Sequence, residues 1–288
     1  MQNKPLVSVI MNCLNCEQYL RDAIDSVYAQ TYDNWEIVFW DNGSCDKSSE
    51  IAKSYDSKLK YFRSEETSIL GAARVSAVGK AKGEYFAFLD CDDIWFKDKL
   101  NKQMKIFFED GEDLGLVYGR CEVLYQNKNE KIISKGPLVE GLIFENLAKE
   151  NFIAFVSVIV KSNVFHASGG FPMSIKHSTD YWLFLKIAKN YRVRALQEVC
   201  CTYRYHSNNL SSKNRVLAAK EAIQIVSMFL PGKAANEGLK YHNDNLTIAY
   251  IKEWSILKSL DNLLKNGGLF RILFKAISKI TRILRVKL

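Results

Sequence analysis

The sequence predicts an α/β fold in which a mixed, mainly parallel sheet is flanked by helices. In the first half of the chain, short apolar runs alternate with stretches of helical periodicity, which is the pattern of βαβ units. Polar clusters follow the apolar runs that end at Met11, Trp40 and Leu89. Ligands of parallel sheets bind at the carboxyl ends of the strands, so we expect one binding edge built by these three strands.

The first half of the chain contains the elements of this sheet in regular order. The first predicted helix places Leu20, Ile24 and Val27 on one face, as packing against a sheet requires. Asp46 is a suitable N-cap for the second predicted helix. The predicted strands cover residues 6–11, 35–40, 59–62 and 84–89, and the predicted helices cover residues 17–30, 47–55 and 71–82.

The second half is less regular. A helix beginning near Phe96 and an amphipathic helix over 180–190 are predicted from their periodicity, and the chain is helical beyond Ser212. Breaks in this last region are expected at Pro231 and Gly267. Further strands are predicted over residues 114–125, 155–160 and 196–205.

These elements divide the chain into two regions. An α/β domain is expected over residues 1–212, with halves at 1–120 and 121–212. A helical region is expected over 213–288.

The end of the helical region carries much of the net charge of +8. Residues 265–288 contain Lys265, Arg271, Lys275, Lys279, Arg282, Arg285 and Lys287 and no acid, whereas the rest of the chain is nearly balanced. This distribution does not indicate a nucleic-acid-binding face. As a helix, residues 269–286 have an apolar stripe opposite the cations, which suits an interfacial helix on anionic lipid. The alternative is a helix packed on the protein body, and the absence of acids favours lipid.

The cysteines and the N-terminal residues indicate the cellular compartment of the protein. No signal-peptide pattern or long apolar span is present, and the seven scattered cysteines suit reduced thiols, so we expect a cytoplasmic protein. Cys13 and Cys16 have redox or zinc spacing. No second cysteine pair or histidine cluster completes a tetrahedral site, so the sequence predicts free thiols.

A group of carboxylates follows the apolar run that ends at Leu89. Asp90, Asp92 and Asp93 lie within four residues, and such clustered charges repel unless a cation lies among them. Oxygen ligands with open positions favour Mg²⁺ or Mn²⁺, often shared with substrate phosphates. The alternative is a solvated acidic turn that caps the next helix. The residues alone leave both interpretations open.

Motifs spread over residues 5–210 resemble the family 2 glycosyltransferases, which have the A-type (GT-A) fold of nucleotide-diphospho-sugar transferases. They occur in the family's order, which makes the match more specific than any one motif. The matching segments are Pro5-Leu-Val-Ser-Val-Ile10, Gln30-Thr-Tyr32, Asp41-Asn-Gly-Ser44, Lys82-Gly-Glu-Tyr85, the DXD segment Phe88-Leu-Asp-Cys-Asp-Asp93, Gly169-Gly-Phe171, Thr179-Asp-Tyr-Trp-Leu183 and Tyr203-Arg-Tyr-His206.

The resemblance implies a role for each candidate residue. The expected donor-binding residues are Asn12, Asp41, Asn42, Arg74 and Asp90; the expected ligands of Mn²⁺ or Mg²⁺ are Asp92, Asp90, Asp93 and His206; and the expected general base is Asp180. Many relatives have Asp where this chain has Asn42, whose carbonyl can still accept a hydrogen bond from the base. UDP is therefore the favoured nucleotide, with dTDP as an alternative. Asp180 has a purely structural alternative as a helix cap.

The function implied by the resemblance is metal-dependent, inverting transfer of one sugar from a nucleotide-diphosphate donor. The acceptor would be a saccharide or lipid-linked saccharide in surface polysaccharide synthesis, met at the inner face of the membrane. Residues 1–120 would bind the donor and residues 121–212 the acceptor. Two alternatives belong to other classes. A sugar nucleotidyltransferase usually opens with a Gly-rich loop, which the segment after Met11 lacks, and a silent membrane-docked scaffold would not need intact carboxylates.

Overall fold

The computed structural model describes residues 4–207 and 209–252 of the chain. The described residues form two compact units. One contains residues 4–147 and 152–209, and the other contains residues 148–151 and 210–252. The candidate catalytic residues all belong to the first unit.

The first unit is built on one sheet of nine strands. Its order is β3-β2-β1-β4-β8-β6-β9-β5, and β7 pairs with β6 outside this path. The strands are β1 (Val7–Cys13), β2 (Trp35–Asp41), β3 (Leu59–Arg63), β4 (Tyr85–Phe88), β5 (Ile94–Trp95), β6 (Leu114–Tyr125), β7 (Glu130–Ile133), β8 (Ile159–Lys161) and β9 (Arg192–Tyr205).

The pairing in the sheet follows the two halves of the sequence. β3, β2, β1 and β4 pair in parallel, as the βαβ pattern predicts. β8 then pairs antiparallel with both β4 and β6, while β6 and β9 are parallel. The sheet is therefore mixed. The carboxyl ends of β1, β2 and β4 meet at one edge, which places the loops after Met11, Trp40 and Leu89 together.

One predicted strand, over residues 155–160, is only partly correct. Its first residues form the 3₁₀ turn η1 (Phe155–Ser157), and β8 begins at Ile159. The turn forms because Ser157 bonds back to the carbonyl of Ala154 through both its N–H and its hydroxyl. Trp95 Nε1 also donates to the Val156 carbonyl at 2.8 Å. These hydrogen bonds, one of them from the distant residue Trp95, hold a turn where the apolar pattern predicts a strand.

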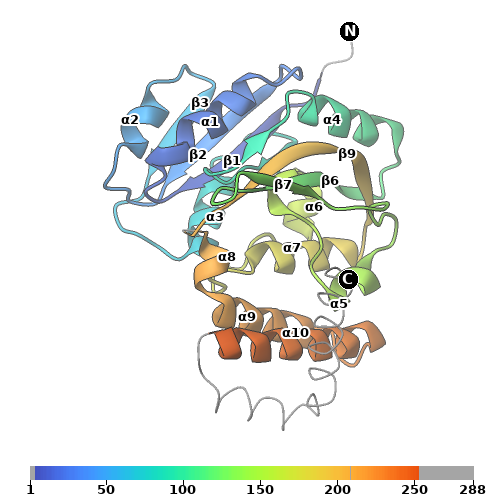
Figure 1. Cartoon of the computed structure of the whole chain (residues 1–288). Coiled ribbons are helices and arrows are strands. Elements are labelled where there is room, and N and C mark those ends of the chain that lie inside the picture. The colour runs from blue at the N-terminus through green and yellow to red at the C-terminus, as the bar shows by residue number, and fades with distance from the viewer. Residues whose placement is uncertain (1–3, 208, 253–288) are drawn as a thin grey trace, which may run out of the picture. The chain divides into compact units, whose positions relative to one another are not determined.

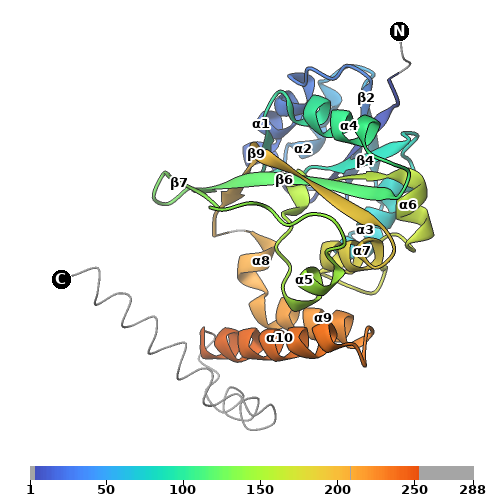
Figure 2. The ribbon, with the colours of Figure 1, turned by 90° about the vertical axis from the view of Figure 1, so that its right-hand side faces the viewer.

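Helices cover both faces of the sheet (Figures 1 and 2). α1, α2 and α4 lie on one side, and α3, α6 and α7 on the other. The helices among the described residues are α1 (Glu17–Tyr28), α2 (Ser48–Lys53), α3 (Leu70–Val78), α4 (Lys99–Glu109), α5 (Phe144–Lys149), α6 (Ser162–Ala167), α7 (Thr179–Ala188), α8 (Leu210–Lys213), α9 (Arg215–Ser227) and α10 (Lys233–Lys252).

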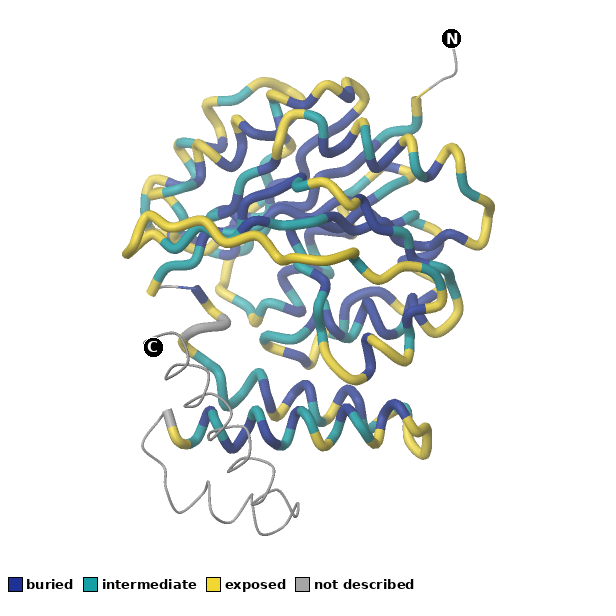
Figure 3. The backbone as a smooth tube through the Cα atoms, turned by 45° about the vertical axis from the view of Figure 1, so that its right-hand side comes forward, coloured by how far each residue is buried: buried dark blue, intermediate teal, exposed yellow. Residues whose placement is uncertain are grey.

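The main core lies between the sheet and the α1, α2 and α4 layer. Alternate residues of β1, from Val7 to Cys13, point into it and pack with the apolar face of α1. This is the period-two pattern of a strand against the 3.6-residue period of a helix. Figure 3 shows the strands largely buried, whereas the β7 segment is exposed.

A buried cation in this core gives a prediction about stability. Lys99 is 1% exposed, its Nζ has no hydrogen-bond partner among the described residues, and it lies 4.1 Å from the centroid of the Trp95 ring. Burial lowers the pKa of Lys99 from 10.5 to about 8. In the unfolded chain Lys99 stays protonated up to its ordinary pKa of 10.5, whereas in the folded chain it loses the proton at about pH 8. The free energy of unfolding therefore rises as the pH is raised from 8 to 10.5. Below pH 8 the folded chain bears the full cost of burying the charged ammonium group.

Lys99→Met is therefore expected to increase the free energy of unfolding at pH 7 by about 2–3 kcal/mol, less whatever the contact with Trp95 contributes. Urea denaturation of both proteins measures the difference, which should shrink as the pH is raised through 8 toward 10.5. Lys97→Met, which changes an exposed lysine, is the control. A destabilised Lys99→Met protein at pH 7 would contradict the prediction.

The second unit contains the helical pair α9 and α10. No helix among residues 4–207 and 209–252 combines the length and the hydropathy needed to cross a bilayer. The basic tail predicted over 265–288 lies outside the described residues, so its choice between lipid and protein stays a prediction.

Candidate active site

The carboxylates after β4 lie beside the end of β9. Asp92 Oδ2 is 3.0 Å from Nε2 of His206 and 3.2 Å from Nδ2 of Asn209. Because an ionised carboxylate only accepts hydrogen bonds, both nitrogens donate to it here. The Asp92 side chain is 28% exposed, so it remains open to a ligand. The fold thus brings together two residues that are 114 positions apart and that the sequence predicts as metal ligands.

Asp93 has a different environment from Asp92. It is buried, and its Oδ1 accepts a hydrogen bond from the backbone N–H of Arg204 at 2.9 Å. Burial and the neighbouring charges of Asp92 and Asp90 raise the pKa of Asp93 well above its usual value. Asp93 therefore fastens the DXD loop to β9 through Oδ1, while its buried Oδ2 has no hydrogen-bond partner among the described residues, and its role as a metal ligand stays a prediction.

Arg204 also braces this junction. Its Nη2 donates to Asp22 at 2.7 Å, and its guanidinium lies 4.8 Å from the centroid of the Tyr19 ring. Tyr19 in turn packs on His206, with ring centroids 5.2 Å apart. These contacts join α1 to the end of β9 and hold the His206 ring next to Asp92.

Asp90 contacts α3 through Arg74. Its Oδ1 lies 3.5 Å from Nη2 of Arg74, and Nη1 of Arg74 donates to the Thr179 hydroxyl at 2.5 Å. Burial raises the pKa of Asp90 to about 6 against the opposing effect of Arg74, and the charges of Asp92 and Asp180 raise it further. Asp180, in the first turn of α7, therefore shares the electrostatic environment of the DXD segment.

Arg74 is a buried residue of the site. It is 5% exposed, and its guanidinium lies 3.9 Å from the centroid of the Phe155 ring and 5.6 Å from that of Phe171. An aromatic enclosure fixes a guanidinium in position through cation–π attraction. Arg74 thus links α3, the DXD segment and the start of α7.

Asp41, at the end of β2, is fully buried and already satisfied. Its Oδ1 accepts from Ser44 N–H at 2.7 Å, and its Oδ2 accepts from the Tyr61 hydroxyl at 2.6 Å and from Arg63 at 2.8 Å. Burial opposes ionisation of Asp41, but the bonds from Tyr61 and Ser44 and the charge of Arg63 outweigh it and lower the pKa. Asp41 therefore shapes the loop, while one acceptor position on its Oδ1 is left over, and the direct contact with a nucleoside stays a prediction.

Asn42 is clamped to the loop that follows β3. Its Nδ2 donates to the carbonyl of Ser68 at 2.8 Å, and its Oδ1 accepts from the N–H and the hydroxyl of Ser68 at 3.1 and 2.9 Å. Both acceptor positions of its carbonyl are therefore occupied. A contact between this carbonyl and a base stays a prediction that requires Ser68 to move, and the amide nitrogen keeps one hydrogen for a ligand.

Asn12 does have an unused donor. Its Nδ2 is buried and has no hydrogen-bond partner among the described residues, and the same is true of Nε1 of Trp40. Asn12 and Trp40 are register partners in β1 and β2, so their side chains lie on the same face of the sheet. Two orphan N–H donors at the carboxyl edge of the sheet are suited to acceptors on a ligand.

The predicted cation ligands can be tested against this arrangement. In the part of the chain that the structure describes, Asp90, Asp92, Asp93 and His206 do not form a group of three ligand atoms within 4.8 Å of one another. An exposed Asp92 beside Asp90 nevertheless fits Mg²⁺ or Mn²⁺, which are often held by one or two carboxylates together with substrate phosphates. His206 then either joins the ligands or orients Asp92.

Two residues of the site escape sequence reasoning. Asn209 bonds Asp92 and also the Arg204 carbonyl, and its Oδ1 accepts from His206 N–H at 2.5 Å. Its only sequence signal is its place three residues after His206, which is common in turns. From the sequence, Trp40 is only the apolar last part of a predicted strand. Its indole N–H, which has no hydrogen-bond partner among the described residues, is what marks it as a candidate ligand contact.

The chain is similar in sequence to glycosyltransferases. The family model described as Glycosyl transferase family 2 matches residues 8–173. An Escherichia coli protein named UDP-Glc:alpha-D-GlcNAc-diphosphoundecaprenol beta-1,3-glucosyltransferase WfgD is 29% identical over 80% of this chain and 88% of its own length. The putative teichuronic acid biosynthesis glycosyltransferase TuaG of Bacillus subtilis is 31% identical over 76% of this chain and 86% of its own.

Solved structures show the same fold. S. aureus TarS 1-349 in complex with UDP-GlcNAc superposes with a TM-score of 0.65 at 19% identity, covering 87% of this chain and 73% of that one. The mannosyltransferase PcManGT from Pyrobaculum calidifontis, in complex with GDP-Man and Mn²⁺, gives 0.64 at 18% identity and covers 99% of this chain and 81% of its own.

The mixed sheet flanked by helices, with its likeness to TarS and PcManGT, has the GT-A fold. The chain belongs to glycosyl transferase family 2, as the sequence motifs predict.

Proposed function

We propose that this glycosyltransferase is metal-dependent and inverting, and that it moves one sugar from a UDP-sugar to a lipid-linked saccharide. The observation that carries the proposal is the bridge made by Arg74. This single buried side chain contacts both Asp90 of the DXD segment and Thr179 at the start of α7. The candidate base Asp180 is therefore held beside the carboxylates that would face the donor diphosphate.

The residues around the DXD segment would divide the work of donor binding. Asp92, supported by His206 and Asn209, would hold a divalent cation, with Asp90 as a second or water-mediated contact. Such a cation supplies charge neutralisation at the diphosphate leaving group. Arg74 places a fixed positive charge next to Asp90, and the unpaired donors of Asn12 and Trp40 suit acceptors of the nucleoside.

Asp180 would act on the acceptor. An inverting transfer needs a carboxylate that accepts the proton of the acceptor hydroxyl while that oxygen attacks the anomeric carbon from the face opposite the diphosphate. The charge of Asp180 acts on Asp90, so the candidate base lies within electrostatic reach of the DXD carboxylates. One displacement then inverts the configuration without a covalent intermediate.

Relatives support the choice of donor and acceptor. WfgD is named for a UDP-Glc donor and a diphosphoundecaprenol-linked acceptor, and the TarS structure holds UDP-GlcNAc. PcManGT holds GDP-Man, which keeps GDP as the competing nucleotide. The surface polysaccharide setting rests on WfgD and on TuaG, named for teichuronic acid biosynthesis.

A binding screen followed by product analysis tests the proposal. UDP with Mn²⁺ is expected to raise the melting temperature. At a UDP concentration of 100 times its Kd, the free energy of unfolding should increase by roughly 2–3 kcal/mol. GDP, dTDP and UDP without metal should have smaller effects. Incubation with UDP-sugars and a polyprenyl-diphosphate saccharide should then release UDP and yield an inverted linkage by NMR. Metal-independent stabilisation, or a product with the donor's anomeric configuration, would overturn the assignment.

A further inference from the structure

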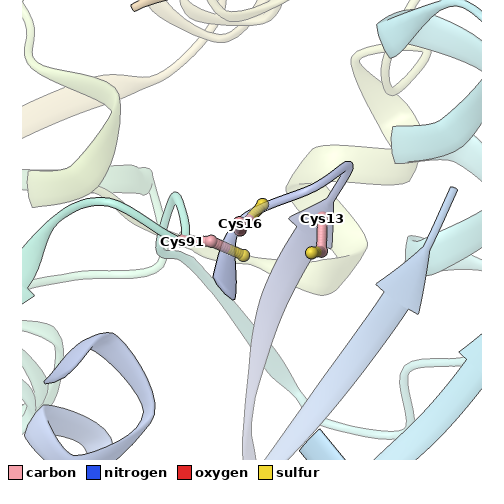
Figure 4. Close-up of side chains that lie close together, drawn as sticks. All are labelled: Cys13, Cys16 and Cys91. Atoms are coloured by element: carbon pink, nitrogen blue, oxygen red, sulfur yellow. The ribbon is translucent and has the colours of Figure 1, made fainter. Parts of the chain in front are cut away.

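Three cysteines from separate parts of the sequence meet next to the DXD segment (Figure 4). Cys13 ends β1, Cys16 immediately precedes α1, and Cys91 lies between Asp90 and Asp92. Their sulfur atoms all lie within 4.8 Å of one another. In the close-up, the sulfurs of Cys13 and Cys91 point toward each other and that of Cys16 lies beside them. The sequence alone left Cys13 and Cys16 without a partner, and the fold supplies Cys91.

The loop between β1 and α1 is folded so that Cys16 returns over Cys13. Asn15 has a positive φ of 56°, and its side-chain oxygen accepts from Cys45 N–H at 2.8 Å. Its N–H donates to the Ser44 hydroxyl at 3.0 Å. A left-handed Asn is uncommon and needs such support from its surroundings. The turn is thus held by partners outside it and fixes the position of Cys16.

Cys13 and Cys16 have polar neighbours at their sulfurs, whereas the Cys91 thiol donates to the Asn12 carbonyl at 3.3 Å and would give up that proton on binding a metal. Leu14 N–H donates to Cys16 Sγ at 3.3 Å, and the Ser44 hydroxyl lies 3.7 Å from Cys13 Sγ. Cys16 occupies the N-cap of the 12-residue helix α1 without using its side chain as a cap. The positive end of the helix dipole therefore favours negative charge on its sulfur.

The spacing fits a shared metal better than a disulfide. A zinc–sulfur bond of about 2.3 Å places sulfurs roughly 3.8–4.0 Å apart in a tetrahedral or trigonal site. Separations of up to 4.8 Å reach this value with a contraction of less than about 1 Å, whereas a disulfide requires about 2.05 Å. Cys13 and Cys91 are 1% and 4% exposed, and the half-buried Cys16 leaves a path for an ion.

We propose that Cys13, Cys16 and Cys91 form a three-thiolate site for a soft divalent ion of the Zn²⁺ class, with water at the fourth position. Three thiol protons leave to the solvent as three sulfur–metal bonds form, without a change in oxidation state. The site is distinct from the neighbouring carboxylates, because thiolates select soft ions and carboxylates select Mg²⁺ and Mn²⁺. Occupation ties the end of β1 and the start of α1 to the DXD loop.

Cadmium titration of the full chain under reducing conditions tests the site. The expected result is one equivalent bound, with an ultraviolet thiolate-to-metal charge-transfer band that Zn²⁺ displaces. Cys16→Ser and Cys91→Ala should each weaken cadmium binding by more than about 100-fold. Loss of a residue that only supports a metal ligand already weakens binding by up to about 100-fold, and loss of a ligand should weaken it more. Cys45→Ser, which changes a nearby exposed cysteine outside the trio, should bind like the unaltered chain.

A stability measurement separates this site from donor binding. Zn²⁺ should raise the melting temperature of the unaltered chain and of Cys45→Ser but not of Cys16→Ser. The response of Cys16→Ser to nucleotide with Mn²⁺ should stay unchanged, which also shows that this variant folds. Absence of the charge-transfer band in the reduced unaltered chain would overturn the proposal. An equal band in Cys16→Ser would also overturn it, because the metal would then be bound by other thiols, such as Cys121, Cys200 or Cys201.

Discussion

Asp92→Asn is expected to lower the rate of sugar transfer by about 10³-fold or more. The substitution removes the charge of the partly exposed DXD carboxylate that is bonded to His206. Loss of a metal-held charge at a leaving diphosphate costs several kcal/mol of transition-state stabilisation, and each 1.36 kcal/mol is about a factor of ten. Single-turnover assays with saturating donor and acceptor measure the effect.

The structural consequence of Asp92→Asn should be small. The Asn side chain has the same shape and can still accept a hydrogen bond from Asn209 or His206, so the melting temperature without ligand should change little. The metal-dependent rise in melting temperature with UDP should disappear. Asp98→Asn, at a half-buried acid paired with Lys102, is the matched control and should keep both activity and the nucleotide response. Retention of more than a tenth of the activity in Asp92→Asn would contradict the assigned role.

Asp180→Asn is expected to reduce transfer by about 10²- to 10⁴-fold, the usual contribution of a general base. In contrast to Asp92→Asn, it should leave donor binding intact. Asp180 lies in the first turn of α7, whose start is held by the bond between Thr179 and Arg74, and this bond does not involve the substituted carboxylate. A loss in kcat with an unchanged Kd for UDP and Mn²⁺ is therefore the expected signature.

A purely structural role for Asp180 predicts a different result. If the carboxylate served only as a negative charge near the N-terminus of α7, its replacement would cost about 0.3–1 kcal/mol of stability and little activity. Thermal unfolding and transfer assays on the same samples distinguish the two roles. Asp113→Asn, which changes an exposed acid at the start of β6, serves as the control for loss of one surface charge.

The order of the fold was largely predictable from local patterns. The predicted strand over 114–125 coincides with β6, and the parallel units of the first half occur in the predicted order. Alternation of apolar residues and helical periodicity are local properties, so they can be read without knowing the partner. Residues 155–160 mark the limit of this approach, because bonds from Ser157 and Trp95 decide the backbone there.

The site was predictable as a set of residues but not as a geometry. Asp92 and His206 meet as the resemblance implies, whereas Asp93 turns to the Arg204 backbone and Asn42 turns to Ser68. Which way a loop carboxylate or amide points depends on the donors that distant strands bring to it. No pattern around Asp93 or Asn42 contains that information.

The family, the succession of strands along the chain and the carboxylates after β4 could be inferred from the amino-acid sequence, because they depend on local periodicity and on motifs in a fixed order. Only the tertiary structure decided that Arg74 joins Asp90 to Thr179, and that Cys91 completes a trio with Cys13 and Cys16. These residues are far apart along the chain. Their meeting depends on how the parallel strands align their carboxyl ends, a consequence of packing the whole sheet.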